Sequence, residues 1–153
     1  MDDCADDTER DAMGRSLRVP RWFRVAAVVC LVWNLLGATD FTLTNLRWGP
    51  WLALQPSATM DFVTHLPGWV VAAWGLGVWG SLAGAVLMVA RVRHAAVAYG
   101  LSFAGAVASM TWEYSHGAGA LGGGFAPVAM VVLGAILVQA WFSRRMFWCG
   151  ILR

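Results

Sequence analysis

The sequence contains no lysine and few charged residues of any kind. Charged residues make up 13% of its 153 residues and hydrophobic residues 59%, and all eleven basic residues are arginine. An ordinary soluble domain has about 25% charged residues, so this balance excludes the soluble globular class. A chain of this length has room for about four or five membrane spans with short loops, and none for a separate soluble domain. We expect a single membrane domain and no nucleic-acid partner.

Sequence patterns that carry catalytic chemistry are also missing. Cys4, Cys30 and Cys149 lie far apart and form no CxxC pair, which excludes the redox and zinc motifs built on such pairs. No Ser-His-Asp set, glycine-rich phosphate loop or paired-carboxylate pattern of a hydrolase can be assembled. We therefore expect neither an enzyme nor a bound cofactor.

The strongest positive signal is the apolar run from Trp22 to Asn45. About 20 helical residues cross the roughly 30 Å of bilayer hydrocarbon, so this run predicts a membrane-spanning helix. A helical wheel gives it a lipid face and a second face that other helices or water must cover, because polar groups are costly in lipid. The second face carries Asn34, Gly37, Asp40, Phe41, Thr44 and Asn45.

Three further apolar runs predict spans at about 69–90, 95–114 and 125–143. Together with 22–45 they predict an all-α, polytopic membrane protein folded as a bundle of four transmembrane helices. Residues 1–20 are expected to be a solvated tail, acidic and then basic, because they contain little to bury. Ser143, Arg144 and Arg145 are expected to stop the last span, which closes the transmembrane domain at 21–145 and leaves 146–153 as a short interfacial tail.

Two of these spans have one face of small residues, which favours close helix packing in lipid. In the third span the bulky side chains, Tyr99 among them, are expected to lie away from that face. In the second span Trp74 and Trp79 are expected to face outward. The small or polar positions are Ala73, Gly77, Gly80, Ser81 and Gly84 in the second span, and Ala98, Ser102, Gly105, Ser109, Glu113 and His116 in the third.

The connections between spans differ in character. Residues 46–68 contain three prolines and predict an outer loop on the membrane surface, with a short helical turn over Ser57–Thr64 capped by Ser57. The glycine run at 117–124 predicts a flexible outer loop.

The arginines predict the orientation of the bundle. With both termini in the cytoplasm only Arg47 would lie outside, and the positive-inside rule favours this N-in, C-in topology. Such a bias argues against a dual-topology homodimer. The ten arginines on the cytoplasmic side would be Arg10, Arg15, Arg18, Arg21, Arg24, Arg91, Arg93, Arg144, Arg145 and Arg153.

In this topology a small set of polar side chains could line an outward-facing cavity. One hypothesis is a transporter, in which Asp40 or Glu113 carries a proton while Asn34 and Gln139 bind substrate. A second is a metal site, but only Glu113 and His116 share one helical face, so we expect no metal. A third is that these side chains only fix helix packing, which we favour for most of them. The cavity candidates are Asn34, Asp40, Glu113, His116 and Gln139, and the metal hypothesis would add His65 and Asp61.

Two segments carry a resemblance to a known group. PRWFRVAAVVCLVWNLLGATDF at 20–41 and LPGWVVAAWGLGVWGSLAG at 66–84, with the Arg91-x-Arg93 turn, resemble small bacterial inner-membrane proteins of four helices that are often labelled "sugar transporter". The resemblance covers 20 to about 110 and implies a multi-pass protein of the bacterial inner (cytoplasmic) membrane. It implies no catalytic or binding residue. The positions that it marks are Trp33, Asn34, Gly37, Asp40 and Phe41.

These observations leave two functions open. The first is a small integral membrane protein, transporter-like for a small solute, which would form a homo-oligomer because four spans make a thin wall around a pathway. The alternative is a non-catalytic accessory or structural subunit of a larger membrane complex. Its partner would contact the small-residue helix faces. For either function, the lipid bilayer surrounds the protein and is its partner.

Overall fold

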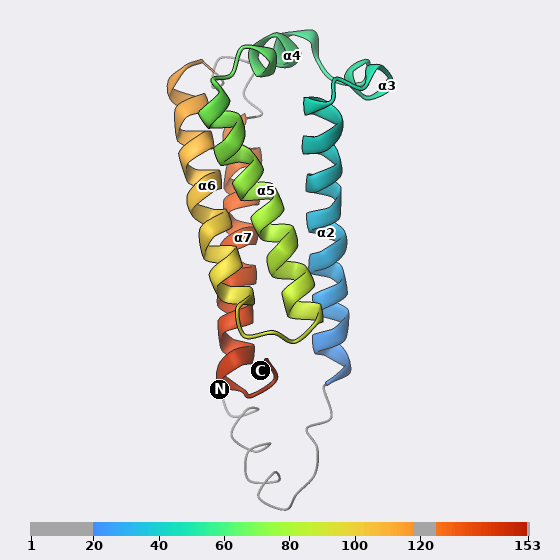
Figure 1. Cartoon of the computed structure of the whole chain (residues 1–153), viewed down its shortest axis with the longest axis vertical. Coiled ribbons are helices and arrows are strands. Elements are labelled where there is room, and N and C mark those ends of the chain that lie inside the picture. Colours follow the sequence, from blue (N-terminus) through green and yellow to red (C-terminus); the bar gives the residue numbers. More distant parts are fainter. Residues whose placement is uncertain (1–19, 118–124, 153) are drawn as a thin grey trace, which may run out of the picture.

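The computed structural model describes residues 20–117 and 125–152, in which every regular element is an α-helix. The four long helices have 21 to 25 residues and are apolar enough to cross a membrane. At 1.5 Å per residue they measure roughly 32 to 38 Å. The predicted all-α, four-helix membrane bundle is therefore confirmed (Figure 1). The helices are α2 (Arg21–Asn45), α3 (Gly49–Leu52), α4 (Ser57–Thr64), α5 (Gly68–Val89), α6 (Ala95–Ser115) and α7 (Phe125–Trp148).

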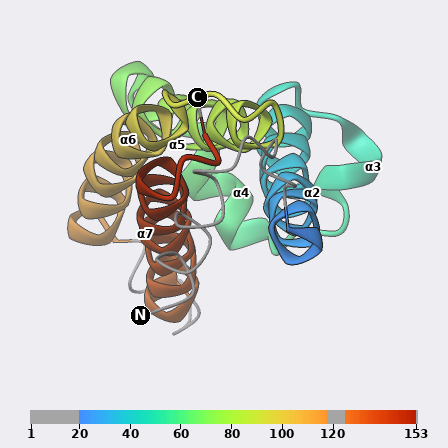
Figure 2. The ribbon, with the colours of Figure 1, turned by 90° about the horizontal axis from the view of Figure 1, so that it is seen from below.

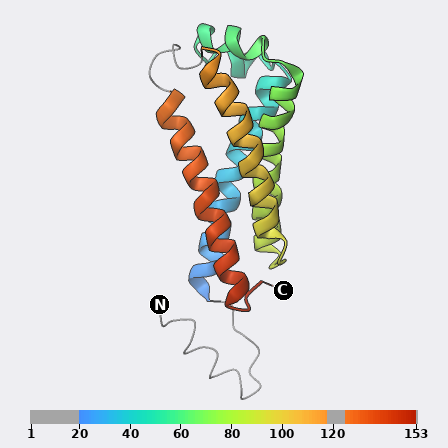
Figure 3. The ribbon, with the colours of Figure 1, turned by 90° about the vertical axis from the view of Figure 1, so that its left-hand side faces the viewer.

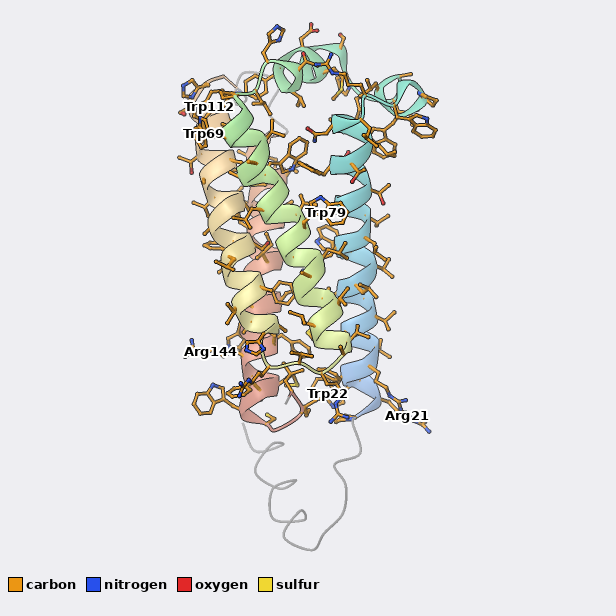
Figure 4. The ribbon with its side chains drawn as sticks, in the orientation of Figure 1. Arg21, Trp22, Trp69, Trp79, Trp112 and Arg144 are labelled. Carbon is orange, nitrogen blue, oxygen red and sulfur yellow. The ribbon has the colours of Figure 1, made fainter. Side chains whose placement is uncertain are left out.

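The two ends of the bundle differ in charge. One end, where α2 begins and α7 finishes, carries every described arginine except Arg47, and we call it the arginine end. The opposite end carries α3 and α4, and we call it the loop end. Figure 4 shows Arg21, Trp22 and Arg144 at the first and Trp69 and Trp112 at the second. The described carboxylates, Asp40, Asp61 and Glu113, all belong to the half of the bundle nearer the loop end.

Helices α5 and α6 form the centre of the bundle through small residues. A Cβ added at Gly77 would lie 3.1 Å from the backbone nitrogen of Ala106, and one added at Gly105 would lie 2.7 Å from the carbonyl oxygen of Ala73. The Ser102 hydroxyl donates a hydrogen bond to the Gly77 carbonyl across the same contact. The predicted small-residue faces are therefore confirmed as packing surfaces, and each is covered by the other.

Two aromatic residues contradict the predicted faces of these helices. Tyr99 is completely buried, because its ring occupies the space that the missing side chain of Gly84 leaves, with ring carbons 3.0 Å from where a Cβ would be. Trp74 packs edge-on against Phe41 of α2, with ring centroids 4.7 Å apart, instead of facing outward. Trp79 is 50% exposed, as expected for a lipid-facing position.

The prediction for the end of the fourth span is wrong. Helix α7 continues through Arg144 and Arg145 to Trp148, because both arginines are exposed and neither interrupts the helix. The chain then turns at Gly150, whose φ is 71°. The Ile151 N–H donates to the Met146 carbonyl at 3.0 Å and the Gly150 N–H to the Phe147 carbonyl at 2.9 Å, which together form a Schellman motif.

The residues after α7 fold back under the bundle and are buried there. Ile151 and Leu152 are 7% and 2% exposed and belong to a buried apolar cluster that we call the base cluster. Figure 2 shows this C-terminal segment crossing from α7 toward the α5–α6 turn. The base cluster closes the arginine end, and its buried members are Phe23, Ala27, Met88, Ala95, Met146, Ile151 and Leu152.

Helices α2 and α7 approach each other at the arginine end and diverge toward the loop end (Figure 3). At the arginine end the Phe23 and Phe142 rings stack with centroids 6.0 Å apart. Nearer the loop end, nothing lies within 4 Å of a Cβ added at Gly37, and Asn45 is exposed. Gly37 and Asn45 were predicted on the covered face of the first span, so that face is narrower than the wheel indicates.

The loop end contains the predicted short helix over Ser57–Thr64, although Pro56, not Ser57, occupies the N-cap position. The predictions for tail residues 1–19, for most of the glycine run (118–124) and for Arg153 lie outside the described residues.

Candidate functional site

The polar centre of the bundle is a direct contact between two amides. The Asn34 Nδ2 group donates to Gln139 Oε1 at 2.6 Å and to the carbonyl oxygen of Cys30 at 2.7 Å. Asn34 and Gln139 are only 5% and 6% exposed. Asn34 lies thirteen residues into α2, which places it roughly 20 Å from the arginine end and near the middle of the span.

The contact between these amides joins two helices that are far apart in sequence. An amide without a partner in hydrocarbon is costly, and interhelical hydrogen bonds of this kind contribute about 0.6 to 2 kcal/mol. Asn34 and Gln139 were both predicted as cavity residues, and the structure brings them together. Their pairing holds α2 to α7 near the middle of α2.

Two carboxylates lie between the amide pair and the loop end. Asp40 is six residues beyond Asn34, roughly 9 Å along α2, and is half-buried. Its carboxylate interacts with the indole of Trp51 in α3, although the buried Trp51 nitrogen makes no hydrogen bond of good geometry within the described part of the chain. Glu113 is half-buried near the end of α6. The Asp40–Trp51 contact is a feature that sequence reasoning missed, because α3 returns over the end of α2 only in three dimensions.

His116 does not join these residues. It follows α6 directly, is exposed, and stacks on Trp112 with ring centroids 4.1 Å apart. Its Nδ1 atom lies 2.9 Å from the Trp112 carbonyl oxygen. His65 is similarly turned toward its own helix, with Nδ1 2.7 Å from the Asp61 carbonyl oxygen. The imidazoles of the metal hypothesis are thus engaged locally, and the described ranges contain no group of three or more His, Cys, Asp or Glu that could hold a metal ion.

The site is asymmetric along the long axis of the bundle. Below the amide pair the base cluster fills the space between the helices with apolar side chains. Above the pair, Asp40 and Glu113 are half-buried and α7 leans away from α2. The half of the bundle nearer the loop end therefore carries the polar side chains, and the half nearer the arginine end carries the apolar base cluster.

Comparison with known proteins assigns no function. No family model, curated protein or solved structure matches the chain. The resemblance to small four-helix inner-membrane proteins therefore stays a prediction. The function has to be argued from the geometry of the bundle.

Proposed function

We propose that this chain is a multi-pass protein of a bacterial inner membrane that admits a small, uncharged polar solute from the loop end to the Asn34–Gln139 pair, as a transporter does. The observation that carries the proposal is the buried amide pair at mid-depth, with an apolar barrier on one side and half-buried carboxylates on the other. Amides are rare at this depth in membrane helices, and polar groups there often mark a solute pathway.

The arginines support the proposed orientation. Six of the seven described arginines lie at the arginine end, and only Arg47 lies at the loop end. Because cytoplasmic loops carry the excess of basic residues, the arginine end would face the cytoplasm and the loop end the exterior. The resemblance of 20–41 and 66–84 to bacterial inner-membrane proteins supports the same membrane.

The chemistry of the pair favours an uncharged solute. Asn34 Nδ2 uses its hydrogens on Gln139 and Cys30, which leaves Asn34 Oδ1 as an acceptor and Gln139 Nε2 as a donor. One remaining acceptor and one remaining donor suit a hydroxyl group, as in a polyol or sugar, and give no compensation for a net charge in hydrocarbon. Passage beyond the pair would require the base cluster to open, which is the alternating access expected of a transporter.

The proposal is tested by solute flux in proteoliposomes. Osmotic swelling is measured with glycerol and with glucose for the unchanged chain, for Asn34→Ala and for Asn45→Ala. Asn45 is the matched control, because its amide also donates to a carbonyl one turn back, at 2.8 Å, but is exposed. We expect the unchanged chain and Asn45→Ala to swell faster than empty liposomes with at least one solute, and Asn34→Ala to lose most of that difference.

A second candidate function is a non-catalytic structural or accessory subunit. The direct 2.6 Å bond favours it, since the amides satisfy each other and fasten α2 to α7 without a solute. The small-residue faces of α5 and α6 cover each other, so a homo-oligomeric or larger membrane partner would have to contact other faces. Swelling equal to that of empty liposomes for all three chains, together with a lower melting temperature for Asn34→Ala alone, would favour this function over transport.

A further inference from the structure

A cavity separate from the amide pair lies at the arginine end, between the start of α2 and the end of α5. Its volume is about 790 Å³. Three arginines line it, Arg21, Arg24 and Arg91, and its apolar wall includes Phe23, Val28 and Val89. The transport proposal makes no use of this cavity.

The three arginines converge because of their places in the two helices. Arg21 and Arg24 are one turn apart in the first turn of α2 and therefore share a face. Arg91 follows the end of α5 with φ 63°, and its Nε donates to the Ile151 carbonyl oxygen at 3.2 Å. That bond holds the Arg91 side chain in place and leaves its terminal nitrogens available as donors.

No described carboxylate neutralises this group of charges. The nearest described acid along α2 is Asp40, sixteen residues from Arg24, which is roughly 24 Å along the helix. The first turn of α2 contains no acidic residue, and the Pro20 N-cap provides no side-chain hydrogen bond, so its free N–H groups add to the positive potential. Among the described residues, those that line the cavity therefore carry only positive charge, which suits an anion.

The apolar wall decides which anion fits best. Val28 and Val89 are 53% and 44% exposed at the surface of helices that cross the membrane, and Phe23 is buried behind them. A small free anion would leave this wall uncovered. An anionic phospholipid would place its phosphate among the guanidinium groups, which bind phosphate oxygens through paired hydrogen bonds, and its acyl chain against the wall.

We propose that this cavity binds one anionic phospholipid, with the phosphate held by Arg21, Arg24 and Arg91 and an acyl chain lying along Val28 and Val89. The bound lipid would join the start of α2 to the end of α5, next to the base cluster that closes this end.

The test is a native mass spectrometry titration of the full chain in detergent with phosphatidylglycerol, phosphatidylcholine and inorganic phosphate as separate probes. We expect saturable binding of one phosphatidylglycerol, at least about tenfold weaker in the Arg21→Gln/Arg24→Gln double variant, since that variant loses the charge-assisted hydrogen bonds of two guanidinium groups to the phosphate. The matched control is Arg144→Gln/Arg145→Gln, which removes the same charge from exposed positions at the same end. It should retain the affinity within about twofold.

Thermal unfolding shows whether the variants remain folded, and it provides a second readout. Phosphatidylglycerol should raise the melting temperature of the unchanged chain and of the control double variant, but not that of the cavity double variant. If the cavity double variant does not fold, Arg21→Gln alone should show an intermediate loss of affinity. Equal losses in the two double variants, equal affinity for phosphatidylcholine, or displacement of the lipid by inorganic phosphate would each overturn the proposal. The last of these results would identify free phosphate as the ligand.

Discussion

Gly105→Ala is expected to lower the stability of the purified protein by about 2 to 3 kcal/mol, because the contact between α5 and α6 has no room for a methyl group. The added Cβ would lie 2.7 Å from the Ala73 carbonyl oxygen and 2.9 Å from the Gly77 backbone nitrogen. Both are backbone atoms, so the two helices would have to separate. In thermal unfolding followed by circular dichroism, the melting temperature should fall by on the order of 5 to 10 °C.

Gly100→Ala is the control on the same helix. Nothing lies within 4 Å of a Cβ added at Gly100, which is exposed, and alanine has the higher helix propensity. Its melting temperature should be unchanged or slightly raised. Equal effects of the two substitutions would contradict the close packing of α5 on α6.

The second large effect is expected at the C-terminus. Ile151→Ala/Leu152→Ala should cost about 4 kcal/mol or more, because both side chains fill the base cluster and large-to-small changes in a core cost about 2 to 5 kcal/mol each. The loss would loosen the contact between α7, the start of α2 and the end of α5. The melting temperature of the detergent-purified protein measures this effect.

The matched control for the base cluster is Leu35→Ala/Leu36→Ala. These side chains are 46% and 65% exposed on the lipid face of α2, so little packing is lost when they are shortened. The control should melt within a few degrees of the unchanged chain. If Ile151→Ala/Leu152→Ala lowered the melting temperature as little as the control does, these side chains would not be packed in a base cluster. The tail would then lie at the membrane interface, as its composition alone predicts.

The spans themselves could be predicted from the sequence because hydrocarbon thickness dictates the length of an apolar helix. The predicted 22–45, 69–90 and 95–114 lie within one residue, at each end, of α2, α5 and α6. The fourth span was predicted to end five residues too early. Arginine pairs often mark the end of a span, but here the helix continues beyond them and places Met146 in the base cluster.

Side-chain faces were less predictable, because bulk alone does not indicate exposure. Tyr99 was expected to lie away from the small-residue face but fills the space beside Gly84, and Trp74 was expected to face outward but packs on Phe41. The error at Tyr99 has a clear physical cause. A glycine in one helix creates a hole that only a large residue of the neighbouring helix can fill, and a pattern within one helix contains no information about its neighbour.

The sequence predicted which individual residues belong to the candidate site, but not which of them contact each other. The rarity of amides in hydrocarbon singled out Asn34 and Gln139 correctly as inward-facing residues. Their direct bond depends on the rotation of α7 relative to α2, which no sequence pattern specifies. His116 was placed with them by its spacing from Glu113, yet the helix ends before it and the ring stacks back on Trp112.

The proposed functions all require that the bundle crosses the membrane with its arginine end in the cytoplasm. Single cysteines introduced by Leu54→Cys at the loop end and His94→Cys at the arginine end, with the native cysteines replaced by alanine, report this directly. Both positions are exposed and neither substitution removes an acidic residue or an arginine. In intact bacterial spheroplasts a membrane-impermeant maleimide should label Leu54→Cys and should reach His94→Cys only after lysis. Labelling of His94→Cys before lysis, or protection of Leu54→Cys, would contradict the account.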